Sequence, residues 1–427
     1  MPFKRFGLSP EILRAVTEQG YEIPTPIQQQ AIPYVLEGRD LMGRAQTGTG
    51  KTAAFALPML ERLKAHANTS FSPARHPVRA LIITPTRELA VQVGDSFRTY
   101  GRHVPLRYAV VYGGVPIEPQ TKELLAGVEI LVATPGRLLD HVGQRTVNLT
   151  QVDILVLDEA DRMLDMGFLP DIRRIVALLP ERRQTLLWSA TFSSEIRSLA
   201  KSLMKEPVSV DIEPQMTSAV SVEQVVYLVD SARKRELLAE LVRKRNLTQV
   251  LVFTRTKLQA GRLASQLDRD GVDAVAIHGD RTQPERERAL AGFKAGTLRV
   301  LVATDVAARG LDIESLPLVV NYELPHTAHD YVHRIGRTGR AGLTGRAISL
   351  VAPEEEDYLR AVNRLLKRDL PVKVVRGFEP SGAPERATRD VRGRAGARSS
   401  GGRRPPAGGA PRSNPNRAGS SATVAQR

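Results

Sequence analysis

A glycine-rich loop between a short apolar strand and a helix constrains this chain more than any other feature. The stretch from Asp40 to Pro58 reads DLMGRAQTGTGKTAAFALP, and the helix is expected to begin near Lys51. The loop has the spacing of a P-loop, but alanine stands at the position where the pattern has its first glycine. It consists of Ala45, Gln46, Thr47, Gly48, Thr49, Gly50, Lys51 and Thr52.

Each residue type in this loop suits the binding of phosphate. Gly48 and Gly50 allow backbone N–H groups to curl around phosphate oxygens, and the helix N-terminus adds the positive end of its dipole. Lys51 can reach the β- and γ-phosphates, and Thr52 can offer its hydroxyl to Mg²⁺. The loop therefore predicts a nucleoside triphosphate site. The alternative is an ordinary glycine turn between a strand and a helix.

Composition limits the class of protein. At 427 residues the chain is long enough for two or three domains, and the absence of cysteine excludes disulfides, thiolate metal sites and cysteine nucleophiles. No apolar run approaches the ~20 residues of a membrane span, and the start lacks a signal-peptide core. We therefore expect a cytoplasmic protein that does not bind a membrane. Its net charge of +15 favours a nucleic-acid partner.

Basic charge is concentrated at the C-terminal end. From Ser381 to Arg427 the chain has ten arginines and no lysine, against only Glu385 and Asp390, so this tail supplies +8 of the net charge. The rest of the tail is mostly glycine, alanine, serine and proline, a composition that predicts disorder. Arginine-rich tails of this kind bind RNA through its phosphates. The alternative is a solubilising appendage.

Two series of short apolar strands alternate with helical segments, which predicts an α/β fold with mainly parallel sheets covered by helices on both faces. The expected strands are 80–84, 108–111, 130–134, 154–157, 185–188, 250–253, 274–277, 300–304, 319–322 and 347–351. The segment 205–220 has two prolines and no helical period. We predict an N-terminal domain at 1–207, a linker at 208–220, a C-terminal domain at 221–376 and a disordered tail at 377–427.

An acidic cluster follows one of these strands. In ILVLDEAD (154–161), Asp158 can hold Mg²⁺ opposite Thr52, and Glu159 can polarise an attacking water. Acids also favour the first turn of any helix, which is the alternative interpretation. A basic cluster, HRIGRTGR (333–340), offers Arg337 and Arg340 as arginine fingers for the γ-phosphoryl group. The alternative for this second cluster is a basic loop that contacts RNA.

Six smaller clusters place hydroxyls, glycines and arginines after predicted strands, as suits phosphate and ribose contact. Each by itself is an ordinary loop or helix cap. They are PTRE (85–88), GG (113–114), TPGR (134–137), SAT (189–191), QPER (283–286) and TDVAARG (304–310).

Together these motifs, in this order, resemble the DEAD-box RNA helicases of superfamily 2 over about residues 3–376. The resemblance implies two RecA-like domains that close around ATP, Mg²⁺ and single-stranded RNA. Phe6 and Gln28 match the adenine-sensing Q motif, with Phe6 expected to stack on the base and Gln28 to bond its edge. Ala45 is the usual residue of this family at its position. The compact core and VFTRTK (252–257) suggest a bacterial-type, RhlE-like member.

The resemblance also implies roles for residues of the smaller clusters. Ser189 and Thr191 are expected to couple the state of the bound nucleotide to the binding of RNA, through Asp161. Asp312 is expected to contact the ATP ribose. The expected RNA contacts are Arg87, Gly114, Thr134, Arg137, Thr254, Arg286 and Thr304.

The predicted function is that of an ATP-dependent RNA helicase: an RNA-dependent ATPase that locally separates short RNA duplexes or remodels RNA–protein complexes. Two alternatives stay open at this stage. An ATP-gated RNA clamp would hold RNA for long times with slow ATP turnover. A DNA-directed motor would respond equally to DNA or move stepwise along a strand.

Overall fold

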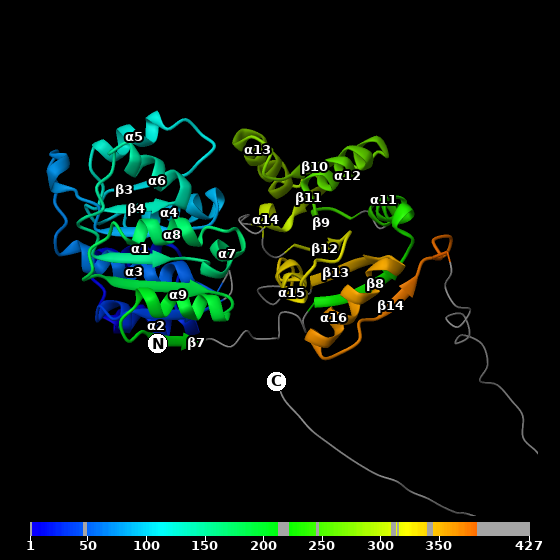
Figure 1. The fold of residues 1–427 in the computed structure, drawn as a ribbon, viewed down its shortest axis with the longest axis horizontal. Helices are drawn as coiled ribbons and strands as arrows, with labels where there is room; N and C mark the ends of the chain where they lie inside the picture. Colours follow the sequence, from blue (N-terminus) through cyan, green and yellow to red (C-terminus); the bar gives the residue numbers. More distant parts are fainter. Residues whose placement is uncertain are drawn as a thin grey trace, which may run out of the picture. The chain divides into compact units, whose positions relative to one another are not determined.

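Two parallel β-sheets of seven strands each organise the chain (Figure 1). The computed structural model describes residues 2–45, 49–211, 222–244, 247–308, 313, 316–339 and 345–381. Predicted site residues Gln46, Thr47, Gly48, Asp312 and Arg340 lie outside these residues, as does the arginine-rich tail from residue 382. Among the described helices, none is long and apolar enough to cross a membrane.

The N-terminal sheet has the strand order β3-β4-β2-β5-β6-β1-β7. Its strands are β1 (Leu41–Arg44), β2 (Ala80–Ile83), β3 (Tyr108–Val111), β4 (Ile130–Ala133), β5 (Ile154–Leu157), β6 (Gln184–Ser189) and β7 (Val208–Asp211). Its helices are η1 (Phe3–Phe6), α1 (Pro10–Glu18), α2 (Pro26–Leu36), α3 (Lys51–Lys64), η2 (Pro73–Arg75), α4 (Arg87–Tyr100), α5 (Glu118–Leu125), α6 (Pro135–Gly143), α7 (Ala160–Asp165), α8 (Leu169–Val176) and α9 (Ser194–Leu203).

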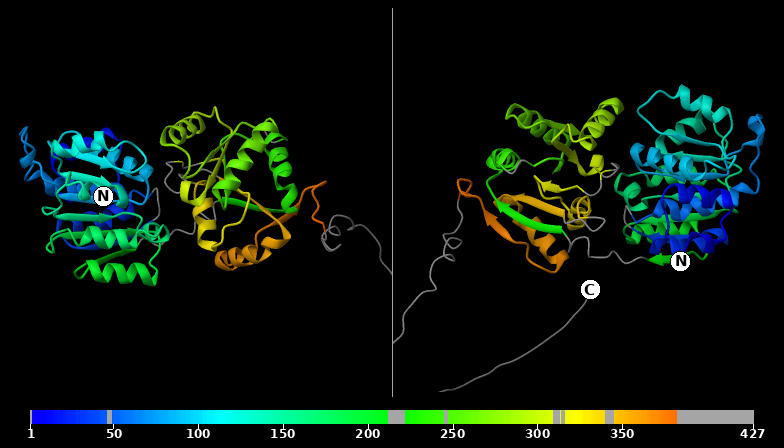
Figure 2. Two further views of the ribbon diagram at one scale, coloured as in Figure 1. Left: turned by 45° about the horizontal axis from the view of Figure 1, so that its top comes forward. Right: turned by 180° about the vertical axis from the view of Figure 1, so that it is seen from behind.

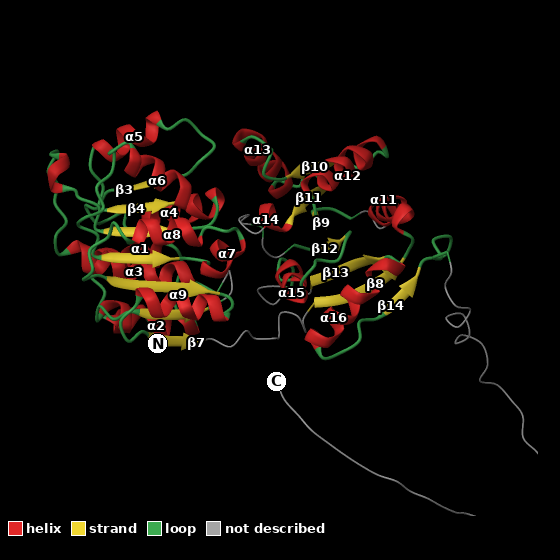
Figure 3. Cartoon of the chain, viewed as in Figure 1, coloured by secondary structure: helices red, strands yellow, loops and turns green. Residues whose placement is uncertain are grey.

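Helices cover both faces of this sheet, because successive side chains of each strand point to opposite sides. In β5, Ile154 and Val156 join a core that includes α1 to α4, whereas Leu155 and Leu157 join a core that includes α5 to α9 (Figure 3). Strands buried on both faces must be apolar throughout, which is why β2, β4 and β5 are continuous apolar runs.

The C-terminal sheet has the order β10-β11-β9-β12-β13-β8-β14. Its strands are β8 (Val222–Leu228), β9 (Val250–Thr254), β10 (Ala274–Ile277), β11 (Val300–Thr304), β12 (Leu318–Asn321), β13 (Gly345–Val351) and β14 (Val372–Val374). Its helices are η3 (Ser231–Arg233), α11 (Lys234–Lys244), α12 (Lys257–Arg269), α13 (Gln283–Lys294), α14 (Asp305–Ala308), α15 (Ala328–Ile335), η4 (Pro353–Glu355) and α16 (Glu356–Leu366). The views in Figure 2 show helices on both sides of this sheet as well.

The two sheets repeat one topology. Numbered from the first strand of each sheet, both orders read 3-4-2-5-6-1-7, which confirms the predicted pair of similar α/β domains. The repeat extends to a turn: Thr84 and Thr254 each donate a side-chain hydrogen bond of 3.3 Å to the carbonyl two residues on. The next helix is then capped by Thr86 in one domain and by Thr256 in the other.

Three strands were missing from the sequence-based prediction. β8 lies between β13 and β14, β14 lies at the sheet edge, and β7 occupies the start of the segment predicted as a linker. β7 and β14 are short and partly exposed, so they lack the continuous apolar run by which the other strands were recognised. Phe378, in the segment predicted as tail, is buried in the core of the C-terminal sheet.

Candidate functional site

The helix after the glycine-rich loop begins at Lys51, as predicted, and Gly50 is its N-cap residue. Gly50 has a φ of +90°, a conformation that side chains disfavour, so glycine is required at this turn. Gln28 donates a hydrogen bond of 3.1 Å from Nε2 to the Gly50 carbonyl, and its Oε1 accepts one of 2.9 Å from the Thr25 N–H. Gln28 therefore fixes the end of the loop that leads into α3.

A cavity of about 400 Å³ opens at this helix N-terminus. That volume is within the range of small-ligand sites. Its walls combine aromatic groups with acidic residues and with residues predicted to bind phosphate. They include Phe3, Tyr21, Gln28, Gly50, Lys51, Thr52, Asp158 and Glu159. The arrangement fits a nucleotide, with the base near the aromatic groups and the phosphates near Lys51.

Phe6, the predicted base-stacking residue, packs edge-on against Phe3, with ring centroids 6.1 Å apart. Phe3, Tyr21 and Tyr100, not Phe6, are the aromatic residues that line the cavity. Tyr21 is one residue that sequence reasoning missed, although it lies only seven residues before Gln28. Stacking by Phe6 stays a prediction.

Lys51 and Asp158, which the sequence analysis assigned to phosphate and to Mg²⁺, contact each other inside this site. Lys51 Nζ lies 3.5 Å from Asp158 Oδ1, and both side chains are almost completely buried. Burial by itself lowers the pKa of Lys51, but the charges of Asp158, Glu159 and Asp161 outweigh it and raise that pKa above its usual value. Lys51 is therefore a permanent cation beside the position expected for phosphate.

Glu159 adopts an unusual backbone conformation, with φ 56° and ψ 53°, at the N-cap position of α7. Its carboxylate forms an ion pair with Arg162, one helical turn further on. Burial alone would raise the pKa of Glu159, but the charges of Arg162 and Lys51 lower it below its usual value. Glu159 is consequently a carboxylate at neutral pH, as its predicted role requires.

Asp161 connects the acidic cluster to the segment after β6. Its Oδ2 accepts hydrogen bonds from the Ala190 N–H at 3.0 Å, from the Thr191 N–H at 2.9 Å and from the Thr191 hydroxyl at 3.1 Å. Ser189 donates from Oγ to the Thr191 carbonyl at 2.6 Å. In the structure, the three residues predicted to couple the state of the bound nucleotide to RNA binding therefore lie together.

The four N-terminal residues predicted to contact RNA follow β2, β3 and β4. Arg87 begins α4, and a Cβ on Gly114 would overlap its guanidinium group, so the two are neighbours. Arg137 donates a hydrogen bond of 2.9 Å to the carbonyl of Val115, next to Gly114. Thr134 is the N-cap residue of α6. They gather at the carboxyl ends of parallel strands, where α/β sheets bind ligands.

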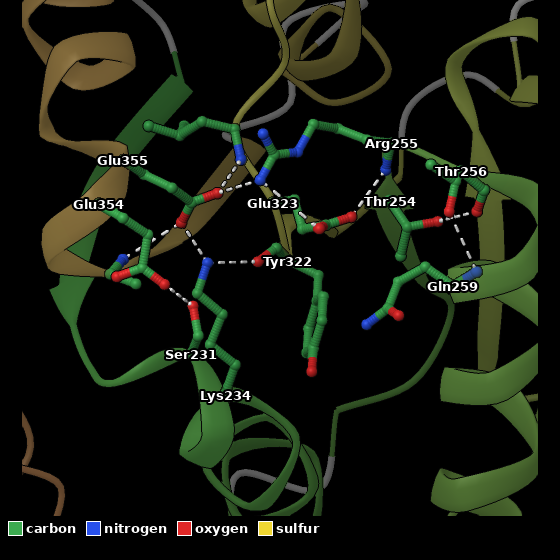
Figure 4. A network of polar contacts seen from close by, with 12 residues as sticks. Ser231, Lys234, Thr254, Arg255, Thr256, Gln259, Tyr322, Glu323, Glu354 and Glu355 are labelled. Carbon is green, nitrogen blue, oxygen red and sulfur yellow. Dashed lines mark hydrogen bonds and ion pairs between the residues drawn. The ribbon is translucent and has the colours of Figure 1, made fainter.

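In the C-terminal domain, Thr254 and Thr304 are paired in register at the ends of β9 and β11. Figure 4 shows the network that fixes this end of β9: Arg255 donates from its N–H to Glu323 at 2.9 Å and pairs with Glu355 at 3.1 Å. Glu355 also pairs with Lys234, a buried cation whose pKa burial lowers. Arg286 lies in α13.

Arg334 is a second residue that sequence reasoning missed. It is completely enclosed and makes a bidentate ion pair with Asp305, at 2.6 and 2.7 Å. It also donates a hydrogen bond of 2.6 Å to the Glu323 carbonyl. Arg334 therefore anchors the HRIGRTGR segment to the end of β11. Three residues on, Arg337 is 7% exposed.

The comparisons with known proteins agree with this geometry. Residues 25–199 match the DEAD/DEAH box helicase family, and residues 233–342 match the helicase conserved C-terminal domain. The ATP-dependent RNA helicase CshA of Listeria monocytogenes is 46% identical over 368 residues, covering 86% of this chain and 69% of that protein. The chain belongs to the DEAD-box RNA helicases. It is an ATP-dependent RNA helicase, and its activity is ATP-dependent unwinding of RNA.

Two further DEAD-box proteins refine the comparison. CshA of Bacillus subtilis is 42% identical over 368 residues, covering 86% of this chain and 73% of that protein. A solved structure of S. cerevisiae Dbp5 bound to RNA and ADP BeF3 is 31% identical, covers 88% of this chain and 95% of that one, and has a TM-score of 0.74. The two sheets are thus two RecA-like domains. The expected RhlE-like subgroup is not supported, since these bacterial relatives are CshA proteins.

Proposed function

We propose that this DEAD-box protein separates short RNA duplexes locally, using ATP and Mg²⁺ held at the cavity beside α3. The observation that carries the proposal is the convergence of Lys51, Asp158 and Glu159 at the N-terminus of that helix. A cation, a buried carboxylate and a second carboxylate are the groups that phosphoryl transfer to water needs. We place the reaction in the cytoplasm.

The residues present suit a magnesium ion. In the described parts of the chain, no group of three or more histidine, cysteine, aspartate or glutamate residues is arranged so that it could hold a metal ion by itself. Mg²⁺ instead needs only one or two carboxylates, water and phosphate oxygens, which Asp158, the Thr52 hydroxyl and bound ATP can supply. When bound, the ion neutralises charge on the phosphates.

Each domain contributes to the proposed cycle. Lys51 holds the β- and γ-phosphates, Glu159 orients the attacking water, and Arg337 with Arg340 stabilises charge on the γ-phosphoryl group. Asp312 meets the ribose, while Phe6 and Gln28 recognise the base. The loop residues Ala45 to Gly50 surround the phosphates with their backbone N–H groups.

RNA binding and ATP binding are coupled in this proposal. Both domains bind the RNA backbone. The residues that contact it in the N-terminal domain are Arg87, Gly114, Thr134 and Arg137, and those in the C-terminal domain are Thr254, Arg286 and Thr304. Asp161 supports the coupling, because its hydrogen bonds to Ala190 and Thr191 join the acidic cluster to Ser189 and its neighbours. ATP and RNA each favour the closed pair of domains, so each strengthens the binding of the other. Hydrolysis then releases the RNA.

The Glu159→Gln variant tests the proposal. It keeps the shape of the side chain but removes the carboxylate that orients water, so ATP and RNA binding should persist while hydrolysis falls by at least ~100-fold. Binding is measured with labelled RNA at saturating ATP, and hydrolysis by phosphate release. Loss of RNA binding together with hydrolysis would show that Glu159 is structural and would contradict the proposal.

A further inference from the structure

Arg162 is a charged residue that pairs directly with Glu159, and no role has been assigned to it. It lies in α7, is 7% exposed, and belongs to the residues of the N-terminal domain that line the wall beside Lys51 and Glu159. Its backbone N–H donates to the Glu159 carbonyl at 3.1 Å, so the first turn of the helix sets the two side chains on one face.

The ion pair between Arg162 and Glu159 differs from an ordinary helical pair. Both side chains are at most 10% exposed. The pair of Arg174 and Asp171 has the same spacing in α8, yet it is 3.6 Å long and its arginine is 69% exposed. A solvated pair of the second kind holds neither partner in place. A buried arginine with a buried carboxylate fixes the orientation of both groups.

Lys51 competes with Arg162 for the Glu159 carboxylate, which is why the orientation of that carboxylate has to be fixed. After Arg162, Lys51 is the cation whose charge lowers the pKa of Glu159 most, and Lys51 pairs with Asp158 at 3.5 Å while Asp161 accepts from Ala190 and Thr191. Without Arg162, the Glu159 carboxylate can turn toward the ammonium of Lys51. That movement would turn the carboxylate away from the attacking water.

The guanidinium group also retains a donor for a ligand. Arg162 Nη1 bonds to Glu159, but Nη2 is buried and has no hydrogen-bond partner among the described residues. Buried donors are seldom left unsatisfied. The attacking water beside Glu159 can accept from Nη2 without disturbing the bond from Nη1, because the two donors of the fork are held in one plane.

We infer that Arg162 is a positioning residue: its guanidinium holds the Glu159 carboxylate toward the attacking water and away from Lys51. This inference rests on the function proposed for Glu159. It concerns the rate of hydrolysis and not the binding of ATP or RNA, since Arg162 acts through a group that is needed only after both have bound.

The test compares three variants of the full chain by RNA-stimulated ATPase kinetics. Arg162→Met keeps the length of the side chain without its charge, and should lower kcat about tenfold or more with KM for ATP and RNA affinity within twofold of the wild type. Arg162→Lys should recover part of kcat, because an ammonium supplies the charge without the fork. Arg174→Met, the matched control, should leave kcat unchanged.

Two outcomes would overturn the inference. A kcat within twofold of the wild type in Arg162→Met would show that Glu159 does not need Arg162 to hold it. A joint loss of kcat, RNA affinity and thermal stability, measured through the single tryptophan Trp188, without recovery in Arg162→Lys, would show a structural role. The Glu159→Gln variant distinguishes the proposed function from this inference. If that variant still hydrolyses ATP, the role proposed for Glu159 is wrong, whatever the Arg162 variants show.

Discussion

Lys51 is the residue on which the proposed ATP chemistry depends most. Its ammonium is buried, charged and 3.5 Å from Asp158. Lys51→Ala should therefore lower ATP turnover by ~100-fold or more, the scale of removing one electrostatic donor from a reaction centre. Lys64→Ala, at the far end of α3, is the matched control and should keep normal turnover. Near-normal turnover in Lys51→Ala would contradict the phosphate-binding assignment.

At the scale of single residues, the sequence predicted best where a motif fixes both spacing and chemistry. Lys51, Asp158, Asp161 and Thr191 lie together as expected, because the ends of neighbouring parallel strands meet at one edge. Arg162 and Arg334 were not predicted, since the sequence does not show which acidic group a buried arginine will meet. Their partners, Glu159 and Asp305, depend on backbone geometry and tertiary contact.

At the scale of elements, strand β1 is packed tightly against its neighbour β6. Gly43 in β1 pairs in register with Trp188 in β6, and a Cβ on Gly43 would overlap the indole ring. We therefore predict that Gly43→Ala lowers the free energy of unfolding by about 1–3 kcal/mol, the usual effect of overpacking. The measurement is urea unfolding followed by the fluorescence of Trp188, the only tryptophan.

Gly136→Ala is the control for this substitution. Gly136 lies in α6, and a Cβ there would have no heavy atom within 4 Å, so the variant should be as stable as the wild type or slightly more stable. Equal stability of Gly43→Ala and the wild type would mean that β1 and β6 can separate to admit a methyl group.

Helix α6 carries a buried histidine that makes stability depend on pH. His141 contacts Thr146 at 2.8 Å and Gln120 at 3.3 Å, and burial, followed by the charge of Arg137, lowers its pKa. The unfolded chain then binds a proton more readily, with a pKa of about 6.5, so the free energy of unfolding should fall as pH drops through about 6.5.

This pH dependence is measured by urea unfolding of the N-terminal domain between pH 8 and pH 5, again through Trp188. His141→Gln should reduce the slope, so that the total loss of stability across this pH range becomes smaller by up to about 1.4 kcal/mol for each pKa unit of the shift. His66→Gln, which changes an exposed histidine, should keep it. An unchanged slope in His141→Gln would assign the pH dependence to other groups.

At the element scale, the central strands could be predicted because burial on both faces requires continuous apolar runs. Boundaries between domains were less predictable: β7 lies in the segment expected to be a linker, and Phe378 is buried beyond the expected end of the C-terminal domain. Edge strands with one exposed face carry little hydrophobic signal. Their pairing with β1 and β8 depends on the rest of each sheet.

At the scale of the whole molecule, the arginine-rich tail adds charge to an already basic protein. Removal of residues 382–427 should weaken RNA affinity and flatten its dependence on salt, by roughly 0.7 in the logarithmic slope for each phosphate that the tail neutralises. The measurement is RNA affinity between about 50 and 300 mM salt for the full and shortened chains. An unchanged slope would show that the tail does not bind RNA.

The two sheets repeat one topology, and the proposed function uses both domains in one cycle. The proposed function requires that ATP turnover depends on RNA. The most direct test is steady-state ATPase activity without nucleic acid, with single-stranded RNA and with DNA of the same sequence. We predict strong stimulation by RNA and little by DNA. Equal stimulation by both, or by neither, would contradict the account.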